Sequence, residues 1–276
     1  MKRILTVAIY GLSALIGVAA FAYPFLTPQL AQMAGQTDAS AHALDAPLLT
    51  LVLLVVCLAV LLIEVQGQAV SAKIVAALGV LVAVTAVLRF AESAIPGPGG
   101  FSLVFTPIIL AGYVFGARFG FLMGTMSLLA SALITGGVGP WLPYQMFTCG
   151  WVGLTAGWLP RLRHYGRQLA LLSVFSFGWG LLYGAIMNLY FWPFVSGVGA
   201  TAWQPGATLY EGLARYAAFY LATSLLWDVG RGLGNAAFVL ALGLPTLRAL
   251  ARFRDRFQFQ LIFPETATFR ENRDSW

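Results

Sequence analysis

Charged and amide side chains are rare in the apolar stretches of this chain, yet its last apolar segment opens with several of them. Asp228 and Arg231 are three residues apart, and Asn235 follows one turn later. On a helix this spacing puts the side chains on one face, where Asp228 and Arg231 could pair with each other or bind a ligand. Ionisable residues inside a membrane span are functional candidates by default.

Aromatic and amide side chains occur together in two further segments. Trp141, Tyr144 and Gln145 lie in and after a run rich in glycine and proline, and Asn188 and Trp192 end another apolar run. Aromatic rings also serve as membrane anchors, but an unsatisfied amide in hydrocarbon is costly. An apolar cavity with a few convergent polar groups is typical of a small-molecule site. We therefore predict an outward-facing binding site made of Trp141, Tyr144, Gln145, Asn188, Trp192, Asp228, Arg231 and Asn235.

Signatures of catalysis, metal binding and cofactor binding are missing from the sequence. There is no GxxxxGK phosphate loop and no HExxH motif, and His42 and His164 lie in predicted loops on opposite faces of the membrane. Cys57 and Cys149 form no CxxC pair and are expected to be small buried hydrophobes. We predict no catalytic residue, no metal site and no cofactor.

The amino-acid composition indicates that most of the protein surface faces lipid. Of the 276 residues, 59% are hydrophobic and only 9% are charged, against roughly a quarter charged in a soluble domain. This excludes a soluble enzyme, a disordered chain and a disulfide scaffold. We predict an all-α integral membrane protein with about eight transmembrane helices. The apolar runs lie at about 4–26, 47–66, 73–89, 102–117, 119–136, 141–160, 168–193 and 229–250. The first run could also be a cleaved signal peptide.

Residues 209–227 are apolar enough to add a ninth span. Joined to the last span they would form a helix of roughly 40 residues, about 60 Å long, which is twice the hydrocarbon thickness. An amphipathic helix at the outer surface, leading into the last span, is therefore favoured.

The positions of the basic residues predict the orientation. The net charge is +6, but the Lys and Arg residues flank apolar runs, which indicates contact with lipid and not with nucleic acid. With eight spans most of them fall on one side: Lys2, Arg3, Lys73, Arg118, Arg161, Arg163, Arg167 and the arginines after Leu247. The other side holds chiefly Arg89 and Arg215. The positive-inside rule then places both termini in the cytoplasm of a multi-pass protein of the cell (inner) membrane.

Small residues recur at four-residue spacing in several spans. Gly116-x-x-x-Gly120-x-x-x-Gly124, Gly153-x-x-x-Gly157 and Gly180-x-x-x-Gly184 favour close helix packing within the bundle. A stripe of Ala72, Ala76, Gly79 and Ala83 starts at the predicted cytoplasmic end of its span. By spacing alone this stripe suits internal packing and the docking of a partner helix equally well.

From about residue 72 to residue 250, the chain resembles the substrate-specific S-component of energy-coupling factor (ECF) transporters. The resemblance is carried by Phe105-Thr106-Pro107, the glycine series 116–124, Gly139-Pro140-Trp141-Leu142-Pro143-Tyr144-Gln145-Met146 and Trp227-Asp228-Val229-Gly230-Arg231 with Gly234-Asn235-Ala236. It implies a six-helix core (69–252) that binds a vitamin or related micronutrient from outside. It also implies association with a T-component and two cytoplasmic ATPases, with Ala72-x-x-x-Ala76 at the docking face. Residues 1–68, with two extra predicted helices, and the polar tail 253–276 are additions to that core.

Two other functions remain open at the sequence level. One is a membrane-embedded enzyme that acts on a lipid or isoprenoid through Asp228 and Arg231. The other is a structural membrane subunit without a ligand, in which the polar outer residues satisfy one another.

Overall fold

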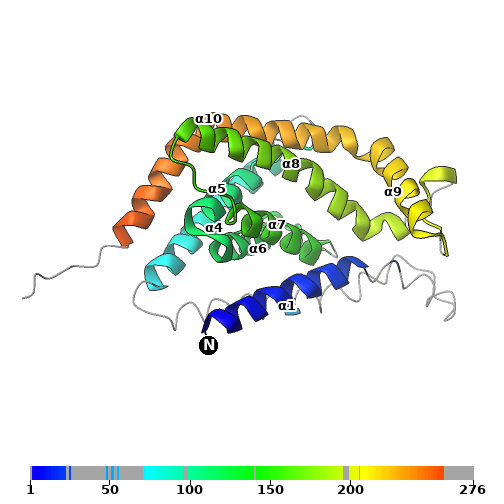
Figure 1. Cartoon of the computed structure of the whole chain (residues 1–276), viewed down its shortest axis with the longest axis horizontal. Helices are drawn as coiled ribbons and strands as arrows, with labels where there is room; N and C mark the ends of the chain where they lie inside the picture. Colours follow the sequence, from blue (N-terminus) through cyan, green and yellow to red (C-terminus); the bar gives the residue numbers. More distant parts are fainter. Residues whose placement is uncertain are drawn as a thin grey trace, which may run out of the picture.

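The structure is a computed structural model that describes residues 2–22, 25, 48, 51–52, 55, 71–95, 99–139, 141–194, 199–204 and 206–257. All regular structure in these residues is helical, which confirms the predicted fold class. Its α-helices are α1 (Lys2–Ala22), α4 (Ser71–Ala94), α5 (Phe105–Phe115), α6 (Ala117–Thr135), α7 (Leu142–Ala156), α8 (Tyr165–Phe191), α9 (Leu209–Thr223) and α10 (Leu225–Phe257). In Figure 1, α8 and α10 run side by side along one long side, α1 lies along the opposite side, and α4–α7 lie between.

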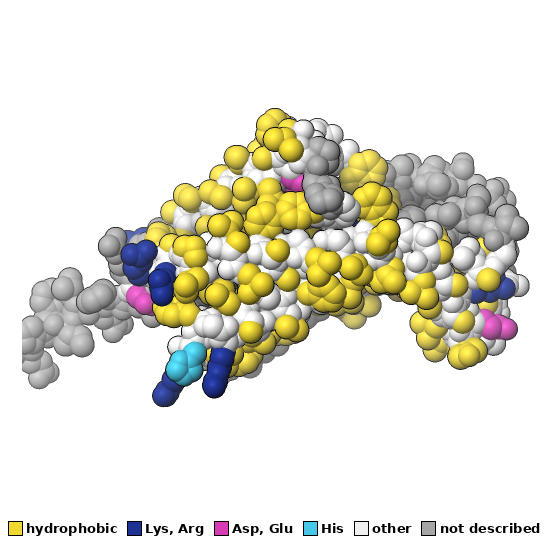
Figure 2. All heavy atoms as spheres, turned by 90° about the horizontal axis from the view of Figure 1, so that it is seen from above, with side chains coloured by type: hydrophobic (Ala, Val, Ile, Leu, Met, Phe, Trp, Pro, Cys, Tyr) yellow, Lys and Arg dark blue, Asp and Glu magenta, His cyan; other side chains and the backbone are white. Residues whose placement is uncertain are grey.

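Helices suited to a membrane make up most of the described bundle. Among the described residues, four stretches are long and apolar enough to cross a bilayer: Lys73–Ala94, Ala117–Thr135, Tyr165–Tyr190 and Leu225–Asp255. Hydrophobic side chains cover much of the visible surface, and basic side chains gather at the end where α10 stops (Figure 2). Most of the predicted span 47–66 and most of the tail 253–276 lie outside the described residues.

Glycines bring the backbones of α6 and α7 into contact. A Cβ on Gly120 would lie 2.1 Å from the carbonyl oxygen of Gly153, and one on Gly124 would lie 2.1 Å from the carbonyl oxygen of Cys149. Any side chain at these positions would push the helices apart. The predicted role of these glycine motifs in packing within the bundle is confirmed.

The segment before the last span is a separate helix. Thr208 caps α9, because its side chain accepts a hydrogen bond from the Glu211 backbone while the Glu211 carboxylate accepts one from the Thr208 backbone. At Ser224 the backbone leaves helical geometry (φ −125°, ψ −29°), which divides α9 from α10. As predicted, the two helices are not continuous. α10 contains Pro245 and changes direction toward its end (Figure 1), and it continues to Phe257, beyond the predicted start of the tail.

The N-terminal helix α1 packs against α7 and α8. Near its end the buried Phe21 meets the Tyr144 ring edge-on at a centroid distance of 5.0 Å and the Trp151 ring at 5.9 Å. One turn earlier, a Cβ on Gly17 would lie 2.6 Å from the Trp151 ring. The first predicted span is therefore packed closely on the helix that carries Tyr144, a predicted site residue.

Candidate functional site

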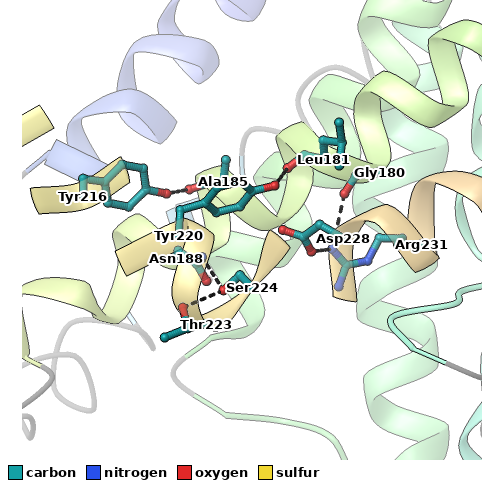
Figure 3. A network of polar contacts seen from close by, with 10 residues as sticks. All are labelled: Gly180, Leu181, Ala185, Asn188, Tyr216, Tyr220, Thr223, Ser224, Asp228 and Arg231. Atoms are coloured by element: carbon teal, nitrogen blue, oxygen red, sulfur yellow. Dashed lines mark hydrogen bonds and ion pairs between the residues drawn. The ribbon is translucent and has the colours of Figure 1, made fainter. Parts of the chain in front are cut away.

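Asp228 and Arg231 form a hydrogen-bonded ion pair in the first turns of α10. Their side chains are 3% and 18% exposed. The Arg231 guanidinium also donates to the Gly180 carbonyl at 3.4 Å (Figure 3). It lies 5.3 Å from the centroid of the Tyr183 ring. The pairing that the sequence left open is therefore made within α10, and the contacts of Arg231 with Gly180 and Tyr183 join α10 to α8.

Glycines on both sides make room for this pair. A Cβ on Gly184 would lie 1.8 Å from a carboxylate oxygen of Asp228, so only glycine fits beside this acid. A Cβ on Gly100 would lie 3.1 Å from the Arg231 guanidinium, and the Gly100 N–H donates to the Trp227 carbonyl at 3.2 Å. The loop after α4 thus packs against the start of α10. The ion pair is enclosed by α8, α10 and this loop.

Asn188 connects α8 to the junction of α9 and α10. Its amide donates to the Ser224 hydroxyl at 2.7 Å. Nearby, the Tyr216 hydroxyl donates to the Ala185 carbonyl, and the Tyr220 hydroxyl donates to the Leu181 carbonyl at 3.3 Å (Figure 3). These three hydrogen bonds therefore hold α9 and its junction with α10 against the half of α8 that is predicted to lie toward the outer leaflet.

Trp192 lies at the centre of an aromatic cluster. The residue is 2% exposed, and its indole N–H donates to the Thr201 carbonyl at 2.9 Å. Its ring packs against those of Trp203 at 5.3 Å and Tyr216 at 5.0 Å. The indole N–H and the ring of Trp192 therefore both have partners within the fold. Through these contacts Trp192 joins Thr201 and Trp203 to Tyr216 of α9.

Gln145, in the first turn of α7, has a partner that the sequence analysis did not include in the site. Its side-chain oxygen accepts a hydrogen bond from the Arg89 guanidinium at 3.3 Å. The predicted span ended at Arg89, but α4 continues to Ala94, so Arg89 lies inside the helix. A lone arginine at the end of an apolar run was the signal available in the sequence.

Cys149 and Tyr183 lie near both arginines. Cys149 is one turn beyond Gln145 on α7, and its buried thiol neighbours the Tyr183 side chain of α8. Arg89 and Arg231 both act electrostatically on these two groups. Cys149 is buried as predicted, but it has a polar neighbour. We call this set the polar layer; its members, from α4, α7, α8 and α10, are Arg89, Gln145, Cys149, Tyr183, Asp228 and Arg231.

The remaining predicted site residues differ in their surroundings. Trp141, at the start of α7, is 43% exposed, whereas Tyr144 is fully buried and its ring lies 4.6 Å from that of Tyr190. Asn235, one turn beyond Arg231, is also fully buried, and neither atom of its amide has a hydrogen-bond partner among the described residues. No cluster of His, Cys, Asp or Glu that could hold a metal ion occurs in the described part of the chain.

Comparison with known proteins identifies the family. The family model described as ECF transporter, substrate-specific component, matches residues 73–243, which is more than half of the chain. No curated protein and no solved structure matches. Members of the matched family are substrate-binding transport subunits and not enzymes, so the hypothesis of a membrane-embedded enzyme is set aside. The chain belongs to the family of substrate-specific components of ECF transporters and is a multi-pass membrane subunit of such a transporter.

Proposed function

We propose that this subunit captures a vitamin or related micronutrient from outside the cell and delivers it by association with a T-component and two cytoplasmic ATPases. The observation that carries the proposal is the polar layer, together with the unpartnered Asn235 amide, inside a mainly apolar bundle. A buried donor or acceptor without a partner costs about 1–3 kcal/mol. A bound polar molecule would remove that cost.

The predicted site residues divide into two roles in this proposal. Gln145, Asn235 and the exposed Trp141 contact the substrate, because each has a polar group or a ring surface still available. The others hold the site in shape, since most of their polar groups and rings already have partners within the fold; they are Tyr144, Asn188, Trp192, Asp228 and Arg231. One carboxylate oxygen of Asp228 is the exception, because it is buried and has no hydrogen-bond partner among the described residues.

The small-residue stripe on α4 supports docking of the T-component. Ala76, Gly79 and Ala83 are exposed, and a Cβ on Gly79 would meet no atom within 4 Å. The side chain of Ala72 lies outside the described residues. The opposite face of α4, with Leu78, is buried in the bundle. The stripe therefore faces away from the core, where a partner helix could approach closely.

We further propose that both termini are cytoplasmic and that α1 is a brace added to the six-helix core. The basic residues of the loop before α8 and of the end of α10 lie on the side expected to face the cytoplasm. Phe21 of α1 contacts Tyr144 and Trp151, so α1 lies beside a residue that we assign to the binding site.

The test is to identify a ligand carried through purification by native mass spectrometry and to measure its affinity for the full chain. Asn235→Leu removes the amide with little change in volume and is expected to weaken binding at least tenfold, with the melting temperature of the ligand-free protein unchanged or higher. Leu233→Ala, at a 58% exposed residue of the same helix, is the matched control. If no ligand is found and no vitamin raises the melting temperature, the proposal is wrong.

A further inference from the structure

The polar layer contains two guanidinium groups and one carboxylate. Arg231 is paired with Asp228 and is further surrounded by a carbonyl and an aromatic ring. Arg89 binds only the neutral amide of Gln145, and no carboxylate of the described residues lies within 4 Å of it. The polar layer therefore has one uncompensated positive charge.

The acid nearest to Arg89 in sequence is already engaged elsewhere. Glu92 lies one turn further along α4, and its carboxylate accepts hydrogen bonds from the Ser102 hydroxyl at 3.1 Å and the Leu103 N–H at 2.9 Å. These bonds hold the loop after α4 at the start of α5. Glu92 is thus turned toward the backbone of the chain and does not neutralise Arg89.

Arg89 is placed to bind something besides Gln145. Its side chain is half-buried, and the bond to Gln145 holds it toward α7. A guanidinium has five N–H donors in a planar fork that matches carboxylate and phosphate oxygens, and the bond to Gln145 uses one of them. The amide NH₂ of Gln145 is a further donor beside it, because its oxygen is the atom that faces Arg89.

We infer that Arg89 is the counter-ion of an acidic group on the substrate, a carboxylate or phosphate that binds between its guanidinium and the Gln145 amide. The inference rests on the proposed function, and it specifies the chemical class of the substrate. An unpaired cation among apolar helices is costly, and an anionic ligand removes that cost. A neutral or cationic compound leaves Arg89 uncompensated.

The experiment compares pairs of compounds that differ in the acidic group alone. Affinities for the full chain are measured in phosphatidylcholine nanodiscs. The carboxylate pairs are biotin and biotinamide, pantothenate and pantothenol, and nicotinate and nicotinamide. The phosphate pairs are pyridoxal 5′-phosphate and pyridoxal, and flavin mononucleotide and riboflavin. In any pair that binds, the acid is expected to bind at least tenfold more tightly, and a ligand carried through purification is expected to contain an acidic group.

Variants assign the preference to Arg89. Arg89→Gln is expected to weaken binding of the acid about 10- to 100-fold and to abolish the preference over its neutral twin. Arg89→Lys should restore part of the preference, because it keeps the charge but not the fork. Arg163→Gln is the matched control, because it removes an exposed cation from the loop between α7 and α8. This loop follows the last turn of α7, whereas Gln145 lies in its first turn.

The outcomes separate this inference from the proposed function. Equal binding of both twins, or an unchanged affinity for the acid in Arg89→Gln, overturns the inference and leaves the proposed function intact. The comparison of each acid with its neutral counterpart is made on the unaltered chain, so it does not depend on whether Arg89→Gln folds. Because a lipid phosphate presents the same chemistry, the measurement is repeated with phosphatidylglycerol. If that lipid displaces the acid in an Arg89-dependent manner and no acidic ligand is found, Arg89 is a lipid site and the inference is wrong. If nothing binds and nothing copurifies, the proposed function fails with it.

Discussion

Removing one member of the Asp228–Arg231 pair should destabilise the fold more than removing both. In Asp228→Ala the Arg231 guanidinium, 18% exposed, keeps only the Gly180 carbonyl and the Tyr183 ring as partners. In the double variant Asp228→Ala/Arg231→Met neither charge of this pair remains. The comparison therefore isolates the cost of an unpaired charge from the cost of losing the contacts.

The expected size follows from the burial of the pair. Breaking a buried ion pair costs about 3–5 kcal/mol, whereas replacing both members by apolar groups is often neutral. Arg231 retains two partners and some exposure, which favours about 3 kcal/mol at the lower end of that range. For a chain of this size each kcal/mol lowers the melting temperature by about 2–4 °C, so Asp228→Ala should lose about 6–12 °C. The double variant should lose less than half of that.

The assay is thermal unfolding of the ligand-free protein in one detergent, followed by tryptophan fluorescence. The matched control is Asp255→Ala, because Asp255 is 59% exposed in its pair with Arg254 and a surface pair contributes about 0–1 kcal/mol. A melting temperature of Asp228→Ala within 2 °C of the unaltered chain would refute the reasoning. A double variant as unstable as Asp228→Ala would refute it as well.

Three further predictions concern other parts of the chain. Phe21→Ala removes the ring that packs on Tyr144 and should lower both the melting temperature, by a few degrees, and the substrate affinity, measured by calorimetry; unchanged affinity would mean that α1 does not brace the site. Ala76→Trp should abolish co-purification with a T-component while leaving substrate binding intact, and continued co-purification would remove the docking proposal. Hydrogen bonds from Thr208 lower the pKa of Glu211 in the folded protein. The contribution of Glu211 to folding stability is therefore present above its unfolded pKa of about 4 and is lost as the pH falls through the lower folded pKa. The unaltered chain should therefore melt above Glu211→Ala at pH 7, and the two should converge toward pH 3; a constant difference would contradict this assignment.

Much of the fold could be predicted from the sequence because lipid imposes strict requirements on it. A run of apolar residues in a membrane must be helical, since only a helix satisfies its own backbone there. The predicted runs at 119–136 and 168–193 accordingly match α6 and α8 closely. The length limit of a span also predicted correctly that a separate helix precedes the last one, although the division falls at Ser224 and residues 225–227 belong to α10. Four-residue glycine spacing predicted close helix packing within the bundle, because small residues permit such contact, and the structure shows it between α6 and α7.

The candidate site was harder to predict because partners far apart in the sequence decide what each side chain does. Asn188 and Trp192 were both predicted to bind the substrate, but Ser224 and Thr201 accept hydrogen bonds from their side chains. Arg89 was counted as a flanking cation, and its bond to Gln145, 56 residues away, cannot be read from local spacing.

Hydropathy and the helical period act over one or two turns, so the amino-acid sequence is sufficient to identify a helical membrane protein and the residues that can share one face of a helix. Only the tertiary structure decided which polar groups are satisfied. Asp228 and Arg231 neutralise each other, Glu92 is occupied by the loop before α5, and Arg89 has a neutral partner. Charge compensation acts through space over a few ångströms, and its result depends on which helices the fold brings together.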